Sequence, residues 1–141
     1  MHWVNTREPF GDRAVLTKLA SAINARAPGR ALHFVPKLNA REIKRLCESL
    51  DFVITGRMHL AIAALGSGTP ALCIAYQQKF EGLLMHFNLP GDLAVPASLL
   101  NDPASMASRI AKAVAGKDAQ QRSIRSRAKR VAKFSAKNFS G

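Results

Sequence analysis

Apolar residues recur along the chain at helical spacing in some segments and in short unbroken runs in others. Residues 11–29 and 39–50 have them three or four positions apart, which predicts one helix in each segment. Between these helices, residues 31–35 form a short apolar run that favours a strand. The second helix is expected to begin after an N-cap at Asn39. Its buried stripe is expected to consist of Ile43, Leu46, Cys47 and Leu50.

The middle of the chain repeats this alternation. Residues 51–55 and 69–76 are rich in apolar and β-branched residues and predict strands, of which the second is buried on both faces. Helical spacing follows each strand, over residues 57–66 and 80–88. A sequence in which helices and strands alternate is typical of an α/β fold. We therefore expect a Rossmann-like parallel sheet with helices on both faces.

Two more helices are expected in the C-terminal part. The first should begin at Pro103, with Asp102 as its N-cap. The second has an apolar stripe formed by Ile124, Ala128, Val131 and Phe134. The expected organisation is an α/β domain over residues 1–116 and a basic amphipathic helix, residues 117–141, that packs on it.

The net charge of +12, from 21 Lys and Arg against 9 Asp and Glu, indicates an anionic partner. Much of the excess lies at the C-terminus, where Asp118 alone opposes a run of basic residues: Lys117, Arg122, Arg125, Arg127, Lys129, Arg130, Lys133 and Lys137. Either this helix packs on the domain and keeps it soluble, or it binds nucleic acid or an anionic membrane. Specific nucleic-acid binding is not expected, because no aromatic residues are interleaved with the charges.

Cysteines, histidines and apolar runs exclude several classes of protein. Cys47 and Cys73 lack metal-site or redox spacing, and we expect two reduced, buried thiols. His2, His33 and His86 are expected to be structural. The N-terminus lacks a signal core, and no apolar run approaches the roughly 18 residues that span a bilayer. The sequence therefore predicts a cytoplasmic protein.

Arg57 and His59 lie where the expected strand over residues 51–55 turns into a helix. Parallel sheets bind ligands at the carboxyl ends of their strands, and a helix N-terminus there favours an anion. Gly56 permits close backbone approach, Arg57 offers a planar fork for a carboxylate or phosphate, and His59 can exchange protons near neutral pH. In the structural alternative, Arg57 pairs with a neighbouring carboxylate and His59 is a hydrogen-bonded core residue.

The second expected strand ends in a similar way. Tyr76 and Lys79 follow it and should emerge at the same edge of the sheet as Arg57. There Lys79 would act as a point charge toward a phosphate or carboxylate. The alternative for Lys79 is a solvated lysine in a loop.

Together these residues resemble the polysaccharide pyruvyl transferase family. The resemblance runs from Asp51 to Leu89, with Arg-x-His at 57–59, a small-residue helix, Gly-Thr-Pro at 68–70 and Tyr-x-x-Lys-x-x-Gly at 76–82. It implies a fold like that of the GT-B-type two-domain transferases. This chain resembles their C-terminal half, and a missing N-terminal half would supply the other wall of the cleft.

The resemblance also implies a reaction, in which a pyruvyl group passes from phosphoenolpyruvate to two sugar hydroxyls and forms a pyruvate ketal. By resemblance, His59 transfers a proton and Arg57 holds the carboxylate or phosphate of the donor. Gly56, Tyr76 and Lys79 would complete the substrate site. No metal and no cofactor are required. The acceptor would be a sugar or lipid-linked saccharide in exopolysaccharide or cell-wall polymer synthesis, with peripheral contact at the inner face of the membrane.

Two other functions stay open. A glycosyltransferase-like half would bind a sugar nucleotide at the same strand ends, and competition with phosphoenolpyruvate would separate it from the first hypothesis. A non-catalytic module would bind nucleic acid or an anionic membrane through residues 117–141.

Overall fold

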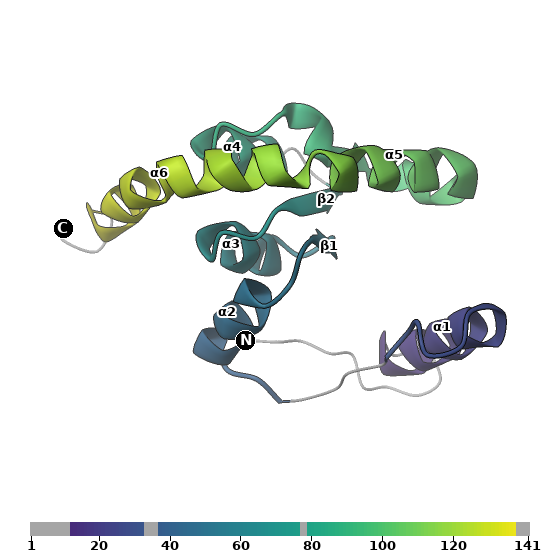
Figure 1. Cartoon of the computed structure of the whole chain (residues 1–141). Coiled ribbons are helices and arrows are strands. Elements are labelled where there is room, and N and C mark those ends of the chain that lie inside the picture. The colour runs from purple at the N-terminus through teal and green to yellow at the C-terminus, as the bar shows by residue number, and fades with distance from the viewer. Residues whose placement is uncertain (1–11, 33–36, 77–78, 138–141) are drawn as a thin grey trace. The chain divides into compact units, whose positions relative to one another are not determined.

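The computed structural model describes residues 12–32, 37–76 and 79–137 of the chain (Figure 1). The chain divides into two compact units, residues 1–39 and residues 40–141. The strand predicted over residues 31–35 falls mostly outside the described residues. His2, His33 and the side chain of Phe134 lie outside them as well.

The first unit contains helix α1 (Asp12–Arg26), which confirms the first predicted helix. After the helix, Gly29 adopts a φ of 72°, and the side chain of Asn24 closes the turn. Its amide nitrogen donates to the carbonyl of Ala31 at 2.7 Å, and its oxygen accepts the N–H of Ala31 at 2.9 Å. The turn is therefore fixed by local hydrogen bonds within this unit.

The second unit is built on a three-stranded parallel sheet of β1 (Val53–Thr55), β2 (Ala71–Ala75) and β3 (Ala94–Pro96). The strand order is β1-β2-β3, so β2 is the central strand. The sheet is flanked by helices, as in a Rossmann-like fold, and this confirms the predicted fold class. The described helices of this unit are α2 (Ala40–Glu48), α3 (Met58–Gly66), α4 (Phe80–His86), α5 (Pro103–Ala115) and α6 (Lys117–Lys137), with 3-10 turns η1 (Gly91–Leu93) and η2 (Ala97–Asn101).

Helix α3 packs on the sheet through small side chains. Ala61 and Ala64 are fully buried, which lets the helix backbone approach β1 and β2 closely. The helix ends in a turn with Gly68 at a φ of 91°, and the N–H of Thr69 donates to the carbonyl of Ala64 at 2.9 Å. The hydroxyl of Thr69 then donates to the carbonyl of Cys47 at 2.6 Å, which links α2 to the start of β2.

The stripe predicted on α2 is only partly buried. Cys47 is 1% exposed and Ile43 packs against the core, but Leu46 and Leu50 are 36% and 42% exposed, so the prediction is wrong for these two. The physical reason is that α2 is short and rests mainly on α3, which covers one narrow face. Leu50 lies beyond the last helical residue, where helical spacing no longer determines its direction.

The C-terminal helices confirm the elements predicted there. The carboxylate of Asp102 accepts the backbone N–H of Ser105 at 3.1 Å and so caps α5. In α6, Ile124 is fully buried in the core of the unit, and Val131 packs against that core. The proposed division of the chain at residue 116 stays a prediction. Within the described ranges, no helix is long and apolar enough to cross a membrane.

Both cysteines are free and buried, as predicted. Burial raises the pKa of the Cys73 thiol to about 12, with a smaller contribution from the charge of Glu81. Burial, followed by the charge of Glu48, also raises the pKa of Cys47. Both thiols are therefore protonated at neutral pH, which argues against a nucleophilic role.

The pKa of Cys73 predicts how stability depends on pH. The folded-state pKa lies above the ordinary value of 9.0. The stabilising effect of the buried, protonated Cys73 thiol is therefore complete below pH 9 and is lost between pH 9 and about 12. We expect the free energy of unfolding to fall there by about 1.4 kcal/mol per pH unit, and this component to be absent from Cys73→Ala. Urea unfolding of both proteins on either side of pH 9 measures it. Equal pH slopes for the two proteins would contradict the prediction.

Candidate active site

The turn after β1 is held by the side chain of Thr55. Thr55 is 6% exposed, and its hydroxyl oxygen accepts the backbone N–H of Arg57 at 2.9 Å. The carbonyl of Arg57 then accepts the N–H groups of Leu60 and Ala61, each at 3.1 Å. Arg57 is therefore the N-cap of α3, with extended backbone angles and an exposed side chain.

The N-terminus of α3 is suited to an anion. The side chain of the N-cap residue makes no capping hydrogen bond, and the first turn contains no acidic residue. The first N–H groups of a helix lack partners within the helix, and its dipole favours negative charge at this end. His59 lies in this first turn and is exposed. Arg57 and His59 thus lie at a helix end whose dipole favours an anionic ligand.

Gly56 and Tyr76 bring the ends of β1 and β2 together. Thr55 pairs with Cys73 in the parallel register, so both chains leave the sheet at the same edge. A Cβ atom on Gly56 would lie 3.2 Å from a ring carbon of Tyr76 and 3.6 Å from the carbonyl oxygen of Ile74. The ring of Tyr76, which is 72% exposed, therefore lies against the Gly56 backbone. Any larger residue at position 56 would move the ring.

Lys79 is the N-cap of α4 and is exposed. It follows β2 at the same edge of the sheet, after residues 77–78, which lie outside the described ranges. The structure thus brings Gly56, Arg57 and Tyr76 close together and places His59 in the first turn of α3. Lys79 is placed at the same edge only because it follows β2, which runs parallel to β1.

Two residues at this edge are missed by the sequence patterns. The hydroxyl of Thr55 fixes the backbone of Arg57, and a Thr-Gly-Arg sequence at a strand end is the signal that could reveal it. Glu81, in the first turn of α4, has one carboxylate oxygen that is buried and lacks a hydrogen-bond partner among the described residues. Its charge acts on Cys73, which places it beside β2. No sequence pattern singles out Glu81.

The sequence profile of the family described as "Polysaccharide pyruvyl transferase" matches residues 7–78, just over half of the chain. The chain belongs to this family. Comparisons with curated proteins and with solved structures found no match. The matched residues of this pyruvyl transferase family member include Gly56, Arg57, His59 and Tyr76, whereas Lys79 lies just beyond them. Membership in a family of transferases implies a saccharide acceptor, and the predicted resemblance is confirmed.

Proposed function

We propose that this chain is a pyruvyl transferase domain that moves the pyruvyl group of phosphoenolpyruvate onto two hydroxyls of a sugar, in exopolysaccharide or cell-wall polymer synthesis. The observation that supports this best is the turn after β1. It combines an exposed arginine, an exposed histidine and a helix N-terminus whose first turn contains no acidic residue. Family membership supports the same conclusion.

The charges at this edge fit the donor. Phosphoenolpyruvate carries a carboxylate and a phosphate in a small volume. The guanidinium of Arg57 can bind either group through two parallel hydrogen bonds, and the first N–H groups of α3 can bind the other. Lys79 would add a third positive charge, and Tyr76 would position the donor against Gly56. Fixed positive groups of this kind stabilise charge that develops on the departing phosphate.

The reaction needs proton transfers that His59 can make. A sugar hydroxyl attacks C2 of phosphoenolpyruvate and loses its proton, while C3 gains a proton and becomes a methyl group. The second hydroxyl then forms a bond to C2 and loses its proton as the bond from C2 to the phosphate oxygen breaks. The proton leaves with the phosphate, which gives the cyclic ketal and inorganic phosphate. We assign proton transfer to His59, because imidazole exchanges protons near neutral pH.

A sugar nucleotide is the main alternative ligand, because its diphosphate would suit the same strand ends. Calorimetric titration with phosphoenolpyruvate, alone and in the presence of UDP-glucose, tests the proposal. We expect phosphoenolpyruvate to bind and an excess of UDP-glucose not to displace it. Binding of UDP-glucose without binding of phosphoenolpyruvate would favour a glycosyltransferase-like function instead.

The acceptor and the site of action are also part of this proposal. We place the chain in the cytoplasm, where the acceptor would be a sugar or a lipid-linked saccharide. Arg122 and Arg125 on α6 are exposed and would attract an anionic membrane surface. Peripheral contact of this kind would bring the chain close to a membrane-borne acceptor.

A further inference from the structure

Tyr76 is the only tyrosine of the sequence, and it is 72% exposed at the carboxyl edge of the sheet. Such exposure is unusual for an aromatic side chain, because the ring carries a large apolar area that folding normally removes from water. The ring nevertheless has a defined place in the fold, against the backbone of Gly56. An exposed aromatic ring that the fold holds in place is suited to contact a ligand.

The ring meets Gly56 with its edge. A Cβ atom on Gly56 would lie 3.2 Å from ring carbon Cε2, and the next nearest atoms are the carbonyl oxygen of Ile74 at 3.6 Å and its Cβ at 3.9 Å. If the ring lay flat on this position, the two carbons bonded to Cε2 would be almost as close as Cε2 itself. The contact therefore uses one corner of the ring, and its flat faces stay accessible.

The same face of the sheet carries further apolar surface. Side chains two positions apart in a strand point to the same side, which groups Ile54 with Gly56 and Ile74 with Tyr76. The parallel register pairs Ile54 with Leu72, so both groups lie on one face of the sheet. On this face Ile54 is 44% exposed and Ile74 is partly buried, whereas the β1 side chains of the opposite face are buried. Apolar surface is thus accessible beside Tyr76.

Hydrogen-bonding groups lie next to this apolar surface. Arg57 directly follows Gly56, caps α3 and has an exposed side chain. Small-molecule sites combine aromatic side chains with a few placed polar groups in this way. A pyranose ring suits such a combination, because its axial C–H groups can lie on the negatively polarised face of an aromatic ring while its hydroxyls stay free.

We propose that Tyr76 binds the acceptor by stacking its accessible ring face on a pyranose with a face of axial C–H groups. The inference rests on the proposed function, because membership in the transferase family implies a saccharide acceptor. It adds a substrate class, since open-chain polyols lack such a face. The edge of Tyr76 borders the donor and its face holds the acceptor, so the sugar hydroxyls lie beside the donor bound at Arg57.

NMR of the full chain with ¹³C-labelled tyrosine tests this role, because the single tyrosine gives ring signals that need no further assignment. The probe is methyl β-D-glucopyranoside, and mannitol, an open-chain polyol, is the comparison. We expect the pyranoside to shift the Tyr76 ring signals and mannitol at the same concentration to leave them unchanged. Saturating the ring signals should affect mainly the axial C–H protons on one face of the sugar.

Variants separate the ring face from the hydroxyl of Tyr76. Tyr76→Ala should weaken binding of the pyranoside about twofold to tenfold, the range expected for one aromatic contact, as measured by the amide signals of residues 54–57. Tyr76→Phe keeps the ring and should bind as the wild type does. Met85→Ala is the matched control, because Met85 is an apolar side chain on α4 that is 76% exposed. Its affinity should equal that of the wild type.

Four results would overturn the inference. These are no shift of the Tyr76 ring signals, equal shifts with mannitol, equal affinities of Tyr76→Ala and Met85→Ala, and a loss in Tyr76→Phe as large as in Tyr76→Ala. The sugar titrations contain no phosphoenolpyruvate, so they do not depend on the donor site. Sugar binding at Tyr76 without binding of phosphoenolpyruvate would support this inference and count against the proposed donor. Binding of phosphoenolpyruvate without a sugar contact at Tyr76 would overturn this inference alone.

Discussion

Ile124→Asp is expected to unfold the second unit at neutral pH. Ile124 is fully buried in the core that α6 shares with the sheet and its helices. Removing a buried isoleucine side chain alone costs about 2–5 kcal/mol. A carboxylate without a partner at the same point adds several kcal/mol more, which is comparable with the whole stability of a small domain. Circular dichroism and urea unfolding measure the effect.

Ser126→Asp provides the matched control for this substitution. Ser126 is exposed on the same helix, so the variant adds the same charge without entering the core. Its stability is expected to stay within about 0.5 kcal/mol of the wild type. Equal urea midpoints for Ile124→Asp and Ser126→Asp would show that α6 does not complete the core. That result would favour the alternative in which residues 117–141 bind nucleic acid or an anionic membrane.

Elements with strong local signals were predictable from the sequence. Asp102 and Pro103 mark the start of α5, and the structure shows the side-chain cap of Asp102 on the N–H of Ser105. Gly68 marks the end of α3, where it adopts a positive φ that other residues rarely reach. Both features depend on a few neighbouring residues, which is why a sequence pattern identifies them.

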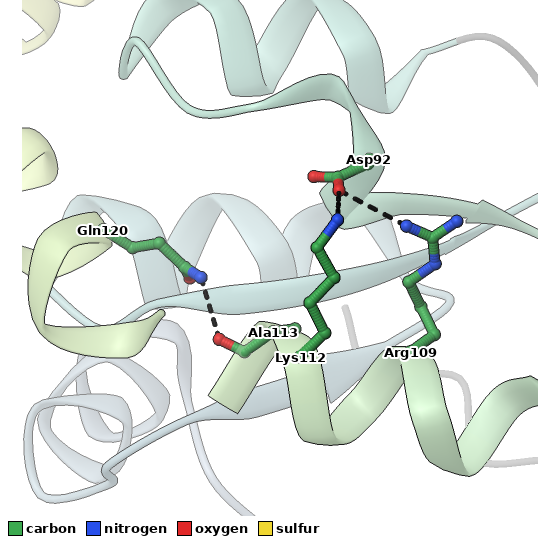
Figure 2. Close-up of polar contacts among 5 residues, drawn as sticks. All are labelled: Asp92, Arg109, Lys112, Ala113 and Gln120. Carbon is green, nitrogen blue, oxygen red and sulfur yellow. Dashed lines mark hydrogen bonds and ion pairs between the residues drawn. The ribbon is translucent and has the colours of Figure 1, made fainter. Parts of the chain in front are cut away.

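Features set by tertiary packing were not predictable. Strand β3 is only three residues long and lies between two 3-10 turns, so its identity comes from pairing with β2. The exposure of Leu46 depends on how little of α2 is covered by α3. The hydrogen bond from the side-chain amide of Gln120 to the carbonyl of Ala113 requires the break between α5 and α6 (Figure 2). The spacing of apolar residues along the chain does not predict such contacts.

The candidate site likewise combines features set by local sequence with features set by tertiary packing. The apolar run that ends at Thr55 made it predictable that Arg57 and His59 follow a strand and open a helix. Parallel sheets bind ligands at such turns, which made both residues candidates. The contact between Tyr76 and Gly56 depends on the register of β1 with β2. The hydroxyl of Thr55 acts on the backbone of Arg57 only in the folded turn. The candidate residues were therefore predictable, but the contacts that position Tyr76 and Arg57 are visible only in the structure.

Arg57→Ala is expected to weaken phosphoenolpyruvate binding by about tenfold to a hundredfold, whereas His59→Ala should leave most of it. The reason is that a guanidinium bound to a carboxylate or phosphate makes charge-assisted hydrogen bonds, and losing them at this exposed position costs about 1.5–3 kcal/mol in all. Arg57→Lys should give an intermediate affinity, because a lysine keeps the charge but loses the planar fork. Calorimetric titration of each variant with phosphoenolpyruvate provides the affinities.

The control for Arg57 is Arg45→Ala, because Arg45 is an exposed arginine on α2 and is not part of the turn after β1. If both alanine variants bind equally weakly, the loss reflects net charge and not a site at the end of β1. If His59→Ala loses as much affinity as Arg57→Ala, the histidine holds the donor and another group must transfer the proton. Only the pattern in which Arg57 controls binding and His59 does not is consistent with a helix end that binds the donor's anionic groups beside a separate proton carrier.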